Sequence, residues 1–201
     1  MKTGLLTWLF ILFSVLAFSQ TGMRNDILTA IKENDFNKVK QFVEAGANVN
    51  GADSNQASML MWAVYKSDMQ MIQYIVSKGA VFNDKGVIYL NEEKTGYYGN
   101  LVGIAAGEGK ADVLKFLIEV CKINIEDKEY DPITKTKTGW TAIQWAAYNG
   151  LIKPVEYLVQ QGANINANHT IDKGTPLLYA VERKKNDVAK FLIEKGAETN
   201  A

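Results

Sequence analysis

The residues best suited to chemistry are few in this chain and stand far apart. It has one cysteine, Cys121, and one histidine, His169. Nucleophilic catalysis needs a nucleophile beside a base, and a zinc site needs a cluster of Cys and His ligands. One residue of each kind supplies neither set, so we expect no catalytic residue, no metal site and no cofactor. We expect Cys121 to be a small packed residue at a helix end and His169 to be a solvated loop residue.

Two other patterns approach known binding motifs but miss them. The segment from Gly103 to Lys110 reads GIAAGEGK, yet its glycine spacing differs from a phosphate-binding loop and Ala111 replaces the Ser or Thr. The acidic pairs at 92–93 and 126–127 lack the arrangement of a calcium loop, which indicates solvated surface. The sequence therefore predicts a protein that is not an enzyme.

Composition and charge exclude further classes of protein. Among 201 residues, Lys plus Arg is 22 and Asp plus Glu is 22, so the formal net charge is zero. No basic excess exists to hold a nucleic-acid backbone, and we expect no nucleic-acid partner. A hydrophobic share of 47% and a charged share of 22% are typical of a folded domain. A single cysteine also rules out a disulfide within the chain.

The first twenty residues have the pattern of an export signal. Lys2 precedes an apolar run from Leu5 to Phe18, and Ala17 and Ser19 occupy the −3 and −1 positions before a cleavage point. A membrane anchor is the alternative, but this run is shorter than the roughly 20 residues that span a bilayer. We expect residues 1–19 to be a signal peptide cleaved after Ser19, and a periplasmic or secreted protein without membrane insertion. An exported protein that does not rely on disulfide bonds is more typical of a bacterium.

Self-similarity dominates the rest of the chain. The pentapeptide GANVN begins at Gly46 and GANIN at Gly162, and looser copies begin at Gly79 and Gly196. Cys121 takes the glycine position in the third of five copies along the chain, so the separations are 33, 42, 41 and 34 residues. Each copy follows an alanine-containing segment by about 21 residues, and five copies in register predict five stacked helix pairs.

These motifs resemble the ankyrin-repeat family. Thr141-Ala-Ile-Gln-Trp-Ala-Ala and Thr175-Pro-Leu-Leu-Tyr-Ala-Val are similar to its Thr-Pro-Leu-His-x-Ala-Ala motif. The resemblance covers residues 23–201 and implies an all-α solenoid of five helix-turn-helix units, at about 23–53, 54–86, 97–128, 138–170 and 172–201. The motif histidine, which braces neighbouring turns in the family, is absent from every copy, which puts turn rigidity in doubt. Charged residues in the first and last units, such as Lys40 and Lys190, predict polar caps.

Two connections are longer than the period requires. Gly79 to Asn100 and Cys121 to Thr141 carry about nine and eight extra residues. In ankyrin-like stacks these connections form hairpin fingers, so we expect two adjacent β-hairpin-like inserts. Their aromatic residues favour contact with a partner, and the alternative is that the rings only hold the hairpins upright. The resemblance implies that the residues after the alanine pair of each first helix face the concave side of the solenoid. It also implies that Trp62 and Trp145 belong to the core, because they fall in a position that a buried Leu usually occupies. The candidate partner-binding residues are Tyr65, Lys66, Tyr89, Tyr97, Tyr98, Glu108, Tyr130, Trp140, Tyr148, Asn149 and Arg183.

The sequence thus predicts an exported, monomeric scaffold that binds an unidentified protein through its concave face and finger loops. The alternative is a specific inhibitor, immunity-like protein or stabilising partner of one periplasmic or secreted enzyme or toxin. An enzyme or small-ligand binder that uses the cleft between the fingers is a third possibility. Neither the partner nor the pathway follows from the sequence.

Overall fold

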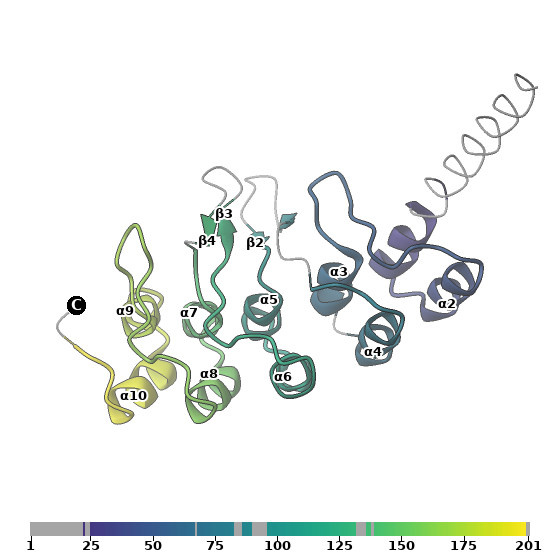
Figure 1. The fold of residues 1–201 in the computed structure, drawn as a ribbon. Coiled ribbons are helices and arrows are strands. Elements are labelled where there is room, and N and C mark those ends of the chain that lie inside the picture. The colour runs from purple at the N-terminus through teal and green to yellow at the C-terminus, as the bar shows by residue number, and fades with distance from the viewer. Residues whose placement is uncertain are drawn as a thin grey trace, which may run out of the picture.

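A computed structural model describes residue 22 and residues 25–66, 68–82, 86–89, 96–131, 136–137 and 139–199. Helix pairs follow one another in a single row, and loops or short hairpins project from one side of it (Figure 1). The expected signal peptide at 1–19 lies outside the described residues. So do the finger residues 90–95 and 132–135, which include the acidic pair at 92–93.

Each unit contributes an inner helix, next to the projecting loops, and an outer helix behind it. The inner helices are residues 25–32, α3 (Met59–Lys66), α5 (Leu101–Gly107), α7 (Ala142–Asn149) and α9 (Pro176–Glu182). The outer helices are α2 (Phe36–Glu44), α4 (Met69–Ser77), α6 (Ala111–Lys115) continued by η1 (Phe116–Val120), α8 (Ile152–Gln160) and α10 (Asn186–Glu194). The predicted all-α solenoid of stacked helix pairs is confirmed.

The row is held together by close packing between like helices. Helix α5 packs on α3 and α7, α7 packs on α9, and α8 packs on α6 and α10. The alanines at the helix crossings are fully or almost fully buried, because a methyl side chain lets neighbouring backbones approach: Ala30, Ala63, Ala105, Ala146 and Ala180. Asp35 and Asp68 cap their outer helices by accepting backbone N–H bonds from Lys38 and Met71. One continuous hydrophobic core results.

The third unit differs from the register that the sequence predicts. Gly46, Gly79, Gly162 and Gly196 have φ between 84° and 92°, but Cys121 is right-handed at −79° and Lys122 takes the left-handed position at 58°. The outer helix absorbs this extra residue as the π-helical turn η1. Lys122, not Cys121, therefore corresponds to the anchor glycines. The outer helix of this unit therefore ends one residue later than the repeat alignment predicts.

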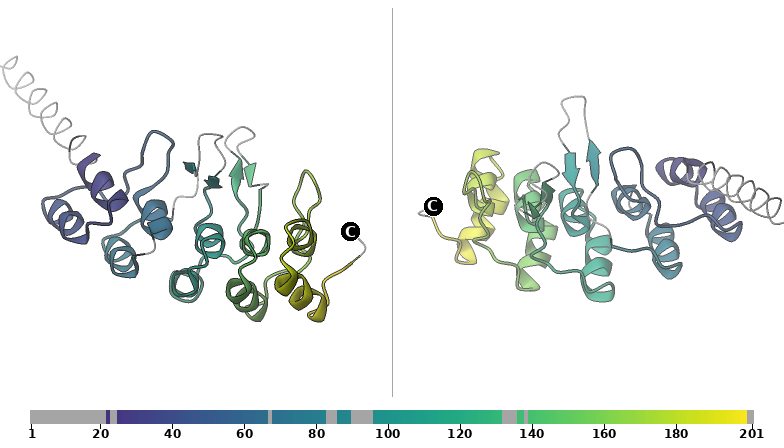
Figure 2. Two further views of the ribbon diagram at one scale, coloured as in Figure 1. Left: turned by 180° about the vertical axis from the view of Figure 1, so that it is seen from behind. Right: turned by 45° about the horizontal axis from the view of Figure 1, so that its top comes forward.

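Both long connections contain antiparallel strand pairs. In the first finger, β1 (Val87–Tyr89) pairs with β2 (Gly96–Tyr98), with Val87 opposite Tyr98. In the second, β3 (Tyr130–Asp131) pairs with β4 (Thr136–Lys137). The two fingers rise from neighbouring units on the same side of the row (Figure 2). The hairpin-like inserts expected from the spacing are therefore present.

Candidate partner-binding face

Seven aromatic side chains follow the inner helices and the bases of the fingers. We call them the aromatic row, and neighbouring ring centroids in it lie 4.3 to 6.4 Å apart. Offset and edge-on ring pairs at such distances each add about 1 kcal/mol beyond the area that they bury. The row crosses four units and consists of Trp62, Tyr65, Tyr97, Trp145, Trp140, Tyr148 and Tyr179.

Tyr97 joins the first finger to the row. Its ring centroid lies 4.7 Å from that of Trp145 and 6.4 Å from that of Tyr65, and its hydroxyl donates to Glu108 Oε1 at 2.7 Å. Only 1% of Tyr97 is exposed. Burial, followed by the Glu108 hydrogen bond, raises the pKa of the Tyr97 hydroxyl far above its usual value. The sequence-based expectation that Tyr97 is displayed is wrong, because the finger folds this ring down onto α5.

Trp140 has the same role for the second finger. It stands just before α7, stacks on Tyr179 with centroids 4.3 Å apart, and contacts Trp145 and Tyr148 at 4.8 and 4.9 Å. Its backbone N–H donates to Glu129 Oε2 at 3.2 Å, and its carbonyl oxygen accepts from the Glu129 N–H. Glu129 is buried. The base of this finger is thus fixed by backbone and carboxylate bonds, and Trp140 stays half-buried within the row.

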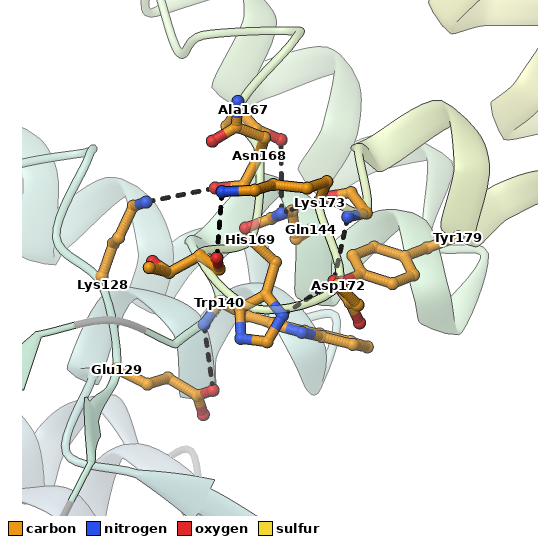
Figure 3. Close-up of polar contacts among 12 residues, drawn as sticks. Lys128, Glu129, Trp140, Gln144, Ala167, Asn168, His169, Asp172, Lys173 and Tyr179 are labelled. Atoms are coloured by element: carbon orange, nitrogen blue, oxygen red, sulfur yellow. Dashed lines mark hydrogen bonds and ion pairs between the residues drawn. The ribbon is translucent and has the colours of Figure 1, made fainter. Parts of the chain in front are cut away.

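A polar network supports the row from the loop that follows α8 (Figure 3). Gln144 donates from Nε2 to the carbonyl oxygens of Ala167 and Gly174, and its Oε1 accepts from the N–H of Thr141. Gln144 stands where the ankyrin motif has histidine, and it bridges to the next unit in the same manner. In this unit the turn rigidity that the missing histidine put in doubt is therefore supplied by an amide.

Figure 3 also shows that His169 is part of this support. His169 Nδ1 lies 2.8 Å from Asp172 Oδ1, and the same carboxylate accepts from the Tyr179 hydroxyl at 2.9 Å and from the Gly174 N–H. The His169 side chain is only 14% exposed. The expectation of a solvated loop residue is wrong, because Asp172 draws the imidazole onto the packed side of the loop.

Cations lie on the outer surface of the row. Lys32 Nζ lies 4.3 Å from the ring of Trp62, Lys66 Nζ lies 5.9 Å from Tyr65, and the Arg183 guanidinium lies 4.1 Å from Tyr148. Lys66 and Arg183 are exposed, whereas Tyr65 and Tyr148 are half-buried. Such stacking leaves the edge of a guanidinium open to an incoming carboxylate.

A depression on this face lies between the ends of α7 and α9. Tyr148, Asn149 and residues 182–185 line a hollow of about 310 Å³. Its lining combines one aromatic ring with three basic side chains and Glu182. The hollow is polar and open, so it suits the side chains of a protein partner better than an enclosed small molecule.

The remaining candidates from the sequence are scattered. Tyr89 is 38% exposed on β1, and Tyr130 is half-buried on β3. The Tyr98 backbone pairs with Val87, but its side chain lies outside the described part of the chain. The Asn149 side chain faces the preceding unit, because its Nδ2 donates to the Gly107 carbonyl oxygen at 2.8 Å. Asn149 therefore braces two units, and its availability to a partner is reduced.

Sequence reasoning assigned Trp62 and Trp145 to the core and missed Tyr179. Both tryptophans are only half-buried, and the Trp62 indole N–H donates to Asp53 Oδ2 at 2.9 Å. The Trp145 indole N–H has no hydrogen-bond partner in the described part of the chain and lies among aromatic rings. Tyr179 occupies the same repeat position as both tryptophans, so the repeat alignment carried the signal for it.

The described residues show neither a metal cluster nor a membrane span. No three His, Cys, Asp or Glu side chains among them gather as metal ligands would. None of the helices in the described ranges is long and apolar enough to cross a membrane.

Comparison with known proteins supports the repeat assignment. The model of the family described as ankyrin repeats (3 copies) matches residues 102–201. Residues 102–201 are ankyrin repeats. Alpha-latroinsectotoxin-Lt1a of Latrodectus tredecimguttatus is 30% identical over 139 residues, which cover 69% of this chain and 9% of the toxin.

Two further relatives match most of this chain. Palmitoyltransferase ZDHHC17 of Homo sapiens is 24% identical over 199 residues, and putative palmitoyltransferase ZDHHC13 of Danio rerio is 26% identical over 198 residues. These alignments cover 88% and 87% of this chain but only 31% and 30% of the relatives. The chain thus spans less than a third of the length of the curated relatives named here.

Proposed function

We propose that this ankyrin solenoid is an exported, non-enzymatic scaffold that binds a partner protein across the inner helices and the fingers. The observation that carries the proposal is the aromatic row, which runs unbroken over four units with exposed cations on top of it. Aromatic and arginine side chains are enriched among the residues that dominate protein interfaces. Ankyrin repeats are themselves a frame for binding proteins, because stacked units present one extended surface.

The contact residues that we propose are those that the structure leaves accessible. Lys66 and Arg183 are exposed, and Tyr65, Trp140 and Tyr148 are half-buried. Tyr97 and Asn149 support this surface from below through Glu108 and Gly107. The two explanations for the finger aromatics therefore combine: some rings hold the hairpins upright, and others remain available for contact.

A photo-crosslinking experiment tests this surface. A photoreactive phenylalanine analogue is placed at Tyr148 or, as a control, at Lys153 on the outer helix α8, and the protein is irradiated in its native host. We expect one discrete protein adduct from position 148 and none of the same mass from position 153. Identification of the adduct separates a general scaffold from the inhibitor, immunity-like or stabilising partner of a single enzyme or toxin.

Charge reversal tests whether the adduct depends on the face. The double variant Lys66→Glu with Arg183→Glu should lose the adduct, because both cations lie over rings of the aromatic row. The matched variant Lys115→Glu with Lys153→Glu changes the same charge on the exposed side of the outer helices and should keep it. Equal loss in both variants, or no adduct at position 148, would exclude the inner face as the binding surface.

Export is a separate part of the proposal and rests on residues 1–20. Their charged start, apolar run and small residues at −3 and −1 support a signal peptide. The single cysteine suits a bacterial periplasm or exterior. Intact-mass measurement of the protein from culture medium and periplasm should show a chain that begins at Gln20. Full-length protein retained inside the cell would contradict export.

A further inference from the structure

Three consecutive basic residues follow α9 on the inner face. Arg183, Lys184 and Lys185 line the hollow between α7 and α9 together with Tyr148, Asn149 and Glu182. We call this depression the basic hollow. It lies between the fourth and fifth units, and both units supply its walls. Three cations against one carboxylate make it positive, although the whole chain has no net charge.

The cations of the basic hollow have no anionic partner of their own. Elsewhere Lys32 Nζ lies 3.2 Å from Asp53 Oδ2, and Lys190 Nζ lies 3.9 Å from Glu194 Oε1. In the part of the chain that the structure describes, neither Arg183 nor the two lysines after it forms an ion pair. The positive charge of the hollow is therefore not neutralised by the protein itself.

Arg183 is held in place by an aromatic ring. Its guanidinium lies 4.1 Å from the centroid of Tyr148, while the Arg183 residue stays exposed. A guanidinium that lies on a ring keeps its N–H edge free, and this planar edge matches the two oxygens of a carboxylate. Because stacking already restricts the side chain, less conformational entropy is lost when a carboxylate binds.

The two lysines are positioned by the turn after α9. The Lys185 stem lies against the preceding unit, since a Cβ added at Gly150 would lie 2.5 Å from the Lys185 Cδ. Lys184 has φ of 55°, a conformation that costs a residue with a side chain more than it costs glycine. The two preceding units have Gly109 and Gly150 at this turn position, with φ of 71° and 75°. The fifth unit thus places an ammonium group where its two predecessors have no side chain.

We propose that the basic hollow binds an acidic segment of the partner protein, and that one carboxylate of this segment pairs with Arg183 above the Tyr148 ring. This inference rests on the proposed function and adds the chemistry of the partner. A nucleic-acid strand matches less well, because its continuous phosphate charge needs a basic surface along its length. The chain has no net charge, and Glu182 borders the hollow.

Fluorescence anisotropy on the purified chain tests the hollow directly. The probe is a rhodamine-labelled short peptide of alternating Glu and Ala, and the matched peptide has Gln in place of every Glu. At low salt we expect the Glu peptide to bind about tenfold more tightly than the Gln peptide, because hydrogen bonds between ionised groups are the stronger ones. Added salt should weaken this preference. Equal binding of the two peptides, or tighter binding of an oligothymidylate of the same charge, would overturn the proposal.

Single variants locate the bound peptide. Arg183→Gln should weaken binding of the Glu peptide about tenfold. Lys184→Gly should weaken it about twofold to fivefold without lowering the urea midpoint of unfolding, because glycine accepts the left-handed turn, so a lost fold cannot explain the result. Lys153→Gln removes an exposed charge from the outer helix α8 and should leave the affinity unchanged. Equal weakening by Lys153→Gln would mean unspecific attraction and would overturn the site.

Competition with the native partner separates this inference from the proposed function. The Glu peptide at saturating concentration should suppress the photo-adduct from position 148, and the Gln peptide should not. An adduct that persists with the Glu peptide bound would overturn the acidic segment and leave the inner face as the binding surface. Absence of any adduct would instead contradict the proposed function, and the peptide titration would still decide whether the hollow binds carboxylates.

Discussion

The hydroxyl of Tyr97 donates to Glu108 Oε1 at 2.7 Å, and this bond ties the first finger to the end of α5. Tyr97 comes from β2 and Glu108 caps the neighbouring inner helix. The finger therefore does not simply project from the solenoid. It is anchored to the helix beneath it, and the position of the aromatic row depends on this anchor.

Loss of this hydroxyl should destabilise the fold without dismantling it. Tyr97→Phe removes the bond to Glu108 but keeps the ring contacts with Tyr65 and Trp145. We expect the free energy of unfolding in urea to fall by about 1–2 kcal/mol. Tyr148→Phe is the matched control, because no hydrogen bond of its hydroxyl occurs in the described residues. A similar loss in both variants would mean that the hydrogen bond to Glu108 does not itself contribute to the free energy of unfolding.

Gly107 should resist substitution for a reason that helix propensity does not predict. Alanine is normally about 1 kcal/mol better than glycine inside a helix. A Cβ at Gly107, however, would lie 2.7 Å from the Tyr97 hydroxyl oxygen and 2.8 Å from its ring carbon. Gly107→Ala should therefore destabilise the protein by about 1–3 kcal/mol in urea unfolding. In the double variant with Tyr97→Leu the two losses should fall short of additivity, and full additivity would show that the contact is not the cause.

Gln144 should be among the least replaceable polar residues of the chain. It is fully buried, and its amide satisfies two carbonyl oxygens in the loop after α8. Gln144→Leu leaves both carbonyls without this donor, so we expect a loss of about 2–4 kcal/mol in unfolding and faster proteolysis of residues 167–174. Gln144→His should recover part of the loss, because an imidazole N–H can donate to the same loop. No recovery would indicate that the site requires the amide geometry.

These residues show how far the sequence predicts the structure. The buried alanines, such as Ala63 and Ala146, follow from the repeat period, because every unit packs on its neighbour in the same way. The buried position of Tyr97 does not follow from the repeat period. The insert that carries Tyr97 has no counterpart in the other units, and the path of this insert decides where the ring lies. The contacts of His169 and Asp172 were not predicted for a similar reason. Asp172 binds His169 within the loop and Tyr179 in the following helix, so the contact joins two elements.

Acid should weaken the loop that carries Asp172. Burial opposes the charge of this carboxylate, but hydrogen bonds from Gly174, His169 and Tyr179 outweigh burial and lower the pKa below the 3.8 of an ordinary Asp. A lowered folded-state pKa gives stability that is fully present above the unfolded value and is lost as the pH falls through the folded value. The difference in unfolding free energy between wild type and Asp172→Asn should therefore shrink as the pH falls below 3.8.

Urea unfolding of both proteins across this range measures the effect. Asp112→Asn is a suitable control, because Asp112 is an exposed carboxylate in the first turn of α6. A difference for Asp172→Asn that grows as the pH falls would contradict the assigned sign.

The third unit offers a test of register, because two adjacent residues compete for the position of the anchor glycine. Lys122 has φ of 58°, a conformation that costs a residue with a side chain about 1 kcal/mol and costs glycine almost nothing. Lys122→Gly should therefore raise the free energy of unfolding by about 0.5–1 kcal/mol. Cys121 is right-handed and packs against the core, so Cys121→Gly should lower it. The opposite pair of results would indicate that Cys121 corresponds to the anchor glycines. The outer helix would then end without the π-helical turn.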